Sequence, residues 1–127
     1  MIPKFRSYDS GSLSRMYQPD EVMVGNGDIW IIDEDSDANE WIVNNDLHLM
    51  QSTGLFDKNS KEIFEGDIVQ FSDSLYTVFY DIKEGSYRLK PHDDRWVIDY
   101  MSNFSSDESF EIVGNIYENP ELLEVGD

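Results

Sequence analysis

The sequence predicts a mainly β fold: a small antiparallel β-barrel or roll with flanking N-terminal hairpins and a short C-terminal helix. Short runs of β-branched and aromatic residues recur along the chain, with turn-forming residues about every ten positions. The chain has 127 residues and no cysteine, and this length suffices for one domain to fold without a disulfide or a metal. Hydrophobic residues make up 39% of the chain, a share that excludes a disordered acidic tail.

The first third of the chain predicts hairpins. Asn26-Gly27 is a strong hairpin turn signal, because both residues tolerate a positive φ. Alternating or β-branched runs flank this turn and recur on either side of it. The strands expected in this part span residues 4–8, 13–17, 28–32 and 40–43.

The middle of the chain carries the strongest strand pattern. Residues 75–82 are rich in aromatic and β-branched types and are apolar on both faces, which is typical of a central strand covered on both sides. Residues 96–100 alternate weakly, so we expect a strand there, with a short helix as the alternative. Further strands are expected at residues 47–50, 68–71, 87–90 and 110–116.

The C-terminal end predicts one short helix over residues 121–125. Asn119 can accept hydrogen bonds from the exposed backbone amides of a first helical turn. Pro120 suits the first helical position, and Glu121 is favoured near the positive end of the helix dipole. The helix would cap the barrel.

We expect one compact unit with two parts. The N-terminal β-hairpin segment spans residues 1–46, and the small β-barrel with its capping helix spans residues 47–127. No internal repeat and no low-complexity linker divides the chain, so the two parts are expected to fold together.

The charge is strongly negative and unevenly distributed. There are 27 acids against 9 bases, which gives a formal net charge of −18. Residues 16–57 carry ten acids and no base, and residues 96–127 carry eight acids and no base. Such a surface repels phosphate backbones, so we expect no direct binding to nucleic acid. It favours solubility, and it also suits a basic partner or the mimicry of a polyanion.

Several classes of protein are not expected. The N-terminal residues carry no apolar stretch of the secretory type, and no run approaches the ~18 apolar residues that a membrane-spanning helix needs. Without cysteine the chain can form no disulfide, thiolate zinc site or cysteine nucleophile. We therefore expect a cytoplasmic protein with no membrane role.

No catalytic, metal-binding or cofactor-binding constellation stands out. Residues 33–37 begin like a calcium-binding loop, but Ala38 and Asn44 stand where that loop needs glycine and a bidentate glutamate. The histidines, His48 and His92, have no partners at metal-ligand spacing. No nucleophile elbow and no phosphate-binding glycine loop is present. We expect no enzyme activity and no cofactor.

The tryptophans are the candidate interaction residues. A tryptophan ring supplies a large apolar area with one polar N–H, a combination that is frequent at protein interfaces. Trp30, Trp41 and Trp96 are therefore candidates for contact with another protein. Core or edge packing in a small β domain is the alternative.

Two segments carry specific motifs. Residues 51–69 have the sequence QSTGLFDKNSKEIFEGDIV, and residues 113–123 have the sequence VGNIYENPELL. They resemble the central and closing signatures of the YopX family of phage and prophage proteins, and residues 4–9 are similar to its start. The central signature usually has glycine where Ser60 stands, which suggests a slightly different turn. The resemblance implies a small β-barrel encoded by a phage or prophage of a bacterial host, and it implies no activity and no catalytic residue.

The residues of these signatures have an architectural interpretation. Gly54, Gly66 and Gly114 are predicted to occupy backbone positions that a side chain would obstruct. The polar residues are predicted to bond nearby backbone groups at turns and strand entries. These polar residues are Asp57, Asn59, Asp67 and Asn115.

Two functions are compatible with these observations. The first is a non-enzymatic protein-interaction module that acts on a host or phage protein, or on itself as a homo-oligomer. The second is an acidic polyanion (DNA) mimic that binds a DNA-processing protein, which requires carboxylates in rows along one face. An enzyme acting through paired carboxylates would instead need a concave pocket with convergent acids.

Overall fold

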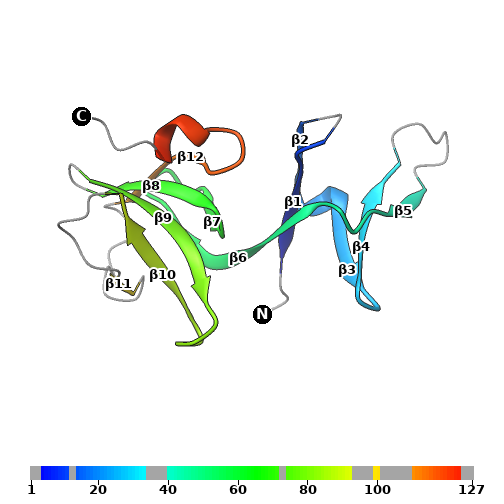
Figure 1. Cartoon of the computed structure of the whole chain (residues 1–127), viewed down its shortest axis with the longest axis horizontal. Coiled ribbons are helices and arrows are strands. Elements are labelled where there is room, and N and C mark those ends of the chain that lie inside the picture. The colour runs from blue at the N-terminus through cyan, green and yellow to red at the C-terminus, as the bar shows by residue number, and fades with distance from the viewer. Residues whose placement is uncertain are drawn as a thin grey trace. The chain divides into compact units, whose positions relative to one another are not determined.

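The computed structural model describes residues 4–11, 14–33, 40–71, 74–92, 99–100 and 110–123. Within these ranges the chain is mainly β and forms three antiparallel sheets, and its helical elements are short 3-10 helices (Figure 1). The predicted mainly β, antiparallel fold is thus confirmed. The chain divides into two compact units, residues 1–52 and 53–127, and the two parts expected at residues 1–46 and 47–127 stay a prediction.

The first unit contains two separate sets of paired strands. β1 pairs with β2 on one side and with the first half of β6 on the other, and β3, β4 and β5 form a separate three-stranded sheet. Its elements are β1 (Phe5–Asp9), β2 (Arg15–Tyr17), the 3-10 helix η1 (Pro19–Glu21), β3 (Val22–Gly25), β4 (Asp28–Ile32), β5 (Trp41–Val43) and the start of β6 (His48–Phe56).

The turn between β3 and β4 is the predicted Asn-Gly hairpin. Asn26 has φ 54° and Gly27 has φ 81°, the positive values that such a two-residue turn requires. The turn sets the register of the sheet, because it places Gly25 opposite Asp28 and Val22 opposite Ile31.

The second unit holds a five-stranded sheet in the order β11-β10-β9-β8-β12. This sheet curves into a half-barrel, not a closed barrel, and β9 is its central strand, as predicted for residues 75–82. The predicted cover on both sides is not complete: Tyr76 and Val78 are buried, whereas the face of Leu75, Thr77 and Phe79 is half-buried. The elements after β6 are β7 (Glu62–Phe64), β8 (Asp67–Phe71), β9 (Ser74–Asp81), β10 (Ser86–Pro91), β11 (Asp99–Tyr100), β12 (Phe110–Asn115) and the 3-10 helix η4 (Pro120–Leu123).

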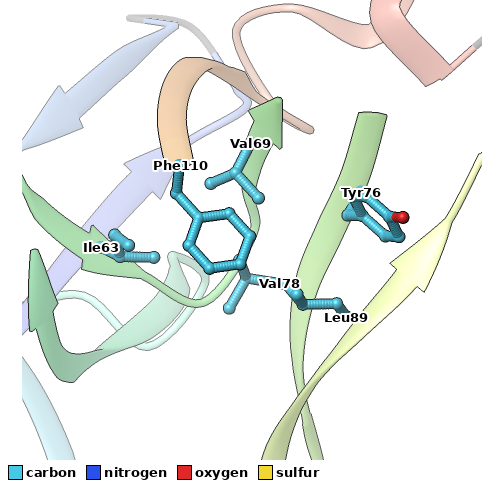
Figure 2. Packing of buried hydrophobic residues seen from close by; sticks show 6 residues of the cluster. All are labelled: Ile63, Val69, Tyr76, Val78, Leu89 and Phe110. Carbon is cyan, nitrogen blue, oxygen red and sulfur yellow. The ribbon is translucent and has the colours of Figure 1, made fainter. Parts of the chain in front are cut away.

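The half-barrel encloses a hydrophobic core. Side chains from β7, β8, β9, β10 and β12 converge there (Figure 2), and all of them are buried. Phe71 extends this cluster, with its ring tilted at 44° to that of Phe110 and the ring centroids 5.2 Å apart. The core consists of Ile63, Val69, Tyr76, Val78, Leu89 and Phe110.

The C-terminal segment differs from the prediction. Residues 120–123 form a 3-10 helix in place of the expected short helix over 121–125. Asn119 does not cap it with its side chain, because its Oδ1 accepts a hydrogen bond from the Asn115 amide at 3.1 Å. The backbone carbonyl of Asn119 instead accepts from the Leu122 amide at 3.0 Å. Tying Asn119 back to β12 leaves one turn of 3-10 geometry.

Candidate functional site

One face of the three-stranded sheet is made of apolar side chains, except for Asp28 at the start of β4. Directly opposed residues in antiparallel strands lie on the same face. Met23 lies opposite Trp30, and Trp30 lies opposite Val43. Ile32 lies opposite Trp41 in the neighbouring row. We call these five residues, Met23, Trp30, Ile32, Trp41 and Val43, the apolar face.

The apolar face is accessible in the first unit. The exposed fractions are 46% for Met23, 36% for Trp41 and 43% for Val43, while Trp30 and Ile32 are half-buried. None of the five carries a charge. A contiguous exposed apolar surface of this kind marks a binding site more often than scattered single residues do.

The opposite face of the sheet explains why the apolar face points outward. Val22 and Ile31 are buried in the core of the first unit together with Tyr17 and Leu47, and Ile29 packs against them. Because neighbouring residues in a strand point to opposite sides, burying this set turns the apolar face away from that core.

Polar contacts at one end of the sheet fix β5 and Trp30. The Trp30 Nε1–H donates to the Gly25 carbonyl at 3.3 Å. Asn45, just after β5, accepts from the Ile29 amide at 2.8 Å and donates to the Asp28 Oδ1 at 2.9 Å. These bonds connect the end of β5 to the start of β4. They therefore fix the position of β5, and with it Trp41 and Val43, relative to Trp30 on β4.

The structure brings two of the three candidate tryptophans together. Trp30 and Trp41 lie on the apolar face in adjacent rows, while Trp96 lies outside the described residues. Met23, Ile32 and Val43 also belong to this face and were not among the candidates predicted from the sequence. The signal was present, because the Asn-Gly turn fixes the register from which the shared face follows.

The acids of the central signature serve the backbone. Asp57 is buried, and its Oδ1 accepts from the amides of Asn59 and Lys61 at 2.8 and 2.9 Å, while its Oδ2 accepts from the Ile112 amide at 3.0 Å. Burial alone would raise the pKa of this carboxyl, but these amides and the charge of Lys61 hold the pKa below its ordinary value. Asp67 is buried as well and accepts from the Phe64 amide at 2.8 Å. Both acids therefore act as architecture, as predicted.

The closing signature also fixes backbone. Asn115 Oδ1 accepts from the amides of Tyr117 and Glu118 at 3.0 and 2.8 Å. A Cβ at Gly114 would lie 2.6 Å from the Asn119 Oδ1 and 2.9 Å from the Leu122 Cδ1. The predicted tie between the last strand and the capping segment is present, and the predicted close approach at Gly114 is confirmed.

Left-handed backbone accounts for other signature positions. Gly54 and Gly66 have φ values of 80° and 85°, so a side chain there would be strained. Ser60 has φ 65°, which is the same left-handed region. The position that is usually glycine in the family signature therefore keeps a glycine-type conformation here.

The histidines contact neighbouring hydroxyl groups. His48 is exposed on β6, with its Nε2 3.0 Å from the Ser10 Oγ. His92 is half-buried, with its Nε2 2.7 Å from the Thr77 Oγ1. Burial lowers the pKa of His92, and the charge of Lys90 adds to this, while a hydrogen bond to the Leu122 backbone opposes it in part. His48 therefore ties β6 to Ser10, and His92, just after β10, ties the end of that strand to β9.

In the part of the chain that the structure describes, no group of three or more His, Cys, Asp or Glu side chains could hold a metal ion. Most of the calcium-like segment, residues 34–39, lies outside that part. Among the described residues, no helix is long and apolar enough to cross a membrane.

The chain was compared with known proteins. A family model described as YopX protein matches residues 4–124. The crystal structure of protein EF1440 from Enterococcus faecalis is similar, with a TM-score of 0.65 and 28% sequence identity over 98% of this chain and 99% of that chain. Among curated proteins, none matches. Because the family model spans nearly the whole chain and the signature residues hold the backbone described above, the chain belongs to the YopX family.

Proposed function

We propose that this protein is a non-enzymatic protein-interaction module, encoded by a phage or prophage and acting in the cytoplasm of a bacterial host. The observation that carries the proposal is the apolar face, where Trp30 and Trp41 lie together on a sheet whose other face is held in the core by Val22 and Ile31. Aromatic side chains in such a setting are frequent anchors of protein interfaces. The signature residues, by contrast, are occupied in backbone contacts.

The partner in this proposal is a host or phage protein, or a second copy of the chain. Nucleic acid is a poor partner, because the net charge of −18 opposes contact with phosphates. A cofactor and a membrane have no part in the proposed function. The apolar face would be the centre of the interface, and Asp28, which shares this face at the start of β4, would belong to its charged rim.

Affinity capture from a lysogenic host tests this function. The wild-type chain is compared with Val43→Ser, which alters the apolar face, and with Val24→Ser, which alters a valine of similar exposure on the other face. We expect the captured protein to be lost with Val43→Ser and kept with Val24→Ser. Equal capture by both variants would remove the apolar face as the binding surface.

The acidic polyanion mimic is the second candidate, and the net charge of −18 is what favours it. It has less support among the described acids. Asp57 and Asp67 are buried, and others pair with bases: Glu21 with Arg15, Asp81 with Arg88 and Glu111 with Lys58. Salt distinguishes the two candidates, because binding through a polyanion mimic weakens steeply as the salt concentration rises, while an apolar interface resists salt.

A further inference from the structure

The edge strand β5 of the three-stranded sheet has outward backbone groups that the proposed function does not use. The order of the sheet is β3-β4-β5, so β5 pairs with β4 on one side only among the described strands. All residues of β5 are exposed. Trp41, Ile42 and Val43 are consecutive apolar residues, and no lysine or proline protects this edge. An exposed apolar edge strand is a template for pairing with another strand.

The backbone groups that face outward can be assigned. The Asp33 amide donates to the Glu40 carbonyl at 2.7 Å, and the Asn44 amide donates to the Ile29 carbonyl at 2.8 Å. Hydrogen bonding to one neighbour alternates along an antiparallel strand. Glu40, Ile42 and Asn44 therefore direct their backbone groups toward β4, and Trp41 and Val43 direct theirs toward the open edge.

We propose that β5 pairs antiparallel with β5 of a second copy of this chain, across a twofold axis at Ile42. This inference rests on the proposed function, because it assigns one partner to the interaction module. In this register Trp41 of each copy lies opposite Val43 of the other, and Ile42 lies opposite Ile42. The outward N–H and C=O groups of Trp41 and Val43 then bond each other across the axis, in the manner of any antiparallel pair.

The side chains fit this register. Trp41 and Val43 lie on the same face of their own sheet, so a Trp41 ring would contact a Val43 side chain of the second copy, an aromatic and β-branched pair that stabilises sheets. A shift by one residue would turn the apolar faces of the two copies to opposite sides. In the proposed register both apolar faces lie on one side, which doubles the surface offered to a further partner.

The charges next to β5 also fit a twofold pair. Glu40 would lie opposite Asn44 of the second copy, a neutral amide. The two Glu40 residues would be separated by four residue steps along the strands, about 14 Å, which exceeds the screening length of about 8 Å at physiological ionic strength. Within residues 40–44, no like charges would oppose each other directly.

Sedimentation velocity over a range of protein and salt concentrations tests the pairing. A pair of three-residue strands buries less than the ~1,200 Å² of a standard interface, so we expect a weak, reversible dimer that is populated at high protein concentration. Its population should rise with salt, because salt screens the repulsion between two acidic copies. A wild-type chain that stays monomeric at all concentrations and salts overturns the proposal.

Three variants locate the contact. Val43→Pro removes an outward N–H without removing a bond to β4, and Val43→Glu places a negative charge against the face of the tryptophan ring and adds to the repulsion between two acidic copies; both should abolish the dimer. Val24→Glu is the matched control, because Val24 has a similar exposed fraction, 42%, on the other edge strand, and it should keep the dimer. Loss of the dimer only with Val24→Glu would contradict the assignment to β5.

Hydrogen exchange gives a readout that misfolding cannot imitate. The amides of Trp41 and Val43 should exchange fast in dilute protein and slowly in concentrated protein, while the Ile42 amide is protected in both because it bonds to β4. Protection of Trp41 and Val43 at every concentration would mean that another segment of the same chain covers the edge, and would overturn the proposal.

Failure of the dimer is distinguishable from failure of the interaction function. Met23→Ser changes the apolar face on β3 and leaves the β5 edge intact. We expect it to keep the dimer and to lose a captured host or phage protein. A monomeric wild type that still captures a protein through Met23 would refute the pairing alone, and a dimer that captures no other protein would confine the function to self-association.

Discussion

The half-barrel and the three-stranded sheet are built from the same residue types and use them differently. In the half-barrel, aromatic and branched side chains from several strands converge on one buried cluster. In the three-stranded sheet, Val22 and Ile31 of one face are buried and Val24 and Ile42 of that face are exposed, while Met23, Trp41 and Val43 stay exposed on the other. The difference shows that an apolar pattern specifies a strand, whereas the layers packed around the strand decide whether its side chains become core or surface.

The polar residues of the two regions differ in a parallel way. In the half-barrel, the Asp57 and Asn115 side chains bond backbone amides and hold turns against strands. In the three-stranded sheet, Asn45 holds the register, and the surface itself is left apolar. The central and closing family motifs therefore describe how the half-barrel is held together, and the candidate interaction surface lies elsewhere in the chain.

The same substitution in both regions should give the largest contrast. Ile63 is 1% exposed in the half-barrel core, and Ile42 is 41% exposed on β5. Ile63→Ala should lower the free energy of unfolding by about 2–5 kcal/mol through lost burial and a cavity. Ile42→Ala should cost less than about 1 kcal/mol. Urea denaturation followed by circular dichroism measures both, and equal losses would show that β5 is covered as fully as the core.

Asp57→Asn should produce the next largest effect. An amide group cannot accept all the bonds that the carboxylate accepts from Asn59, Lys61 and Ile112, so the loss should be roughly 1.5–3 kcal/mol. Asp46→Asn, at an exposed acid outside the half-barrel, is the control and should change little.

The pH dependence of this pair gives an independent check. Because the pKa of Asp57 is lowered on folding, its stabilisation is fully present above the ordinary value of 3.8 and is lost as the pH falls through the lower folded value. The stability difference between the wild-type chain and Asp57→Asn should therefore shrink in acid. A difference that grows in acid would exclude the carboxylate as its source.

Gly114→Ala tests close packing in the half-barrel against open space in the sheet. The new Cβ would displace Asn119 and Leu122 and break the bond between Asn119 and the Asn115 amide, at a cost of about 1–3 kcal/mol. Gly25→Ala is the matched change in β3, where a Cβ meets nothing within 4 Å. It should be neutral or stabilising by less than about 1 kcal/mol. Thermal melts of both variants measure the contrast.

Much of the half-barrel could be predicted from the sequence. Residues 75–82 were identified as a central strand, because aromatic and β-branched residues on both faces are typical of one, and β9 takes that place. The Asn26-Gly27 turn was identified because few sequences satisfy two positive φ angles. Whether the sheet closes into a barrel was not predictable in the same way. Local patterns specify strands, and they do not specify how many strands pair in one curved sheet.

The apolar face shows a second feature that the sequence alone does not predict. Residue type alone makes Trp30, Trp41 and Trp96 candidates. That Trp30 and Trp41 share a face depends on the β4–β5 register, which fixes which side each residue occupies. The 3-10 geometry of residues 120–123 was missed for a related reason, since the side chain of Asn119 has a non-local partner in β12.

The smallest predicted effect is a gain, and it compares two left-handed residues in the two regions. Ser60 has φ 65° in the half-barrel unit, and its side chain is exposed. Ser60→Gly should stabilise the chain by about 0.5–1 kcal/mol, because relief of the left-handed penalty of roughly 1–2 kcal/mol exceeds the extra entropy of unfolded glycine. Ser60→Ala keeps the Cβ and should bring no gain. Asn26→Gly, at φ 54° in the sheet, should gain less, since asparagine already tolerates this conformation. Differential scanning calorimetry ranks the three variants, and a larger gain at Asn26 than at Ser60 would place the backbone strain in the sheet and not in the half-barrel.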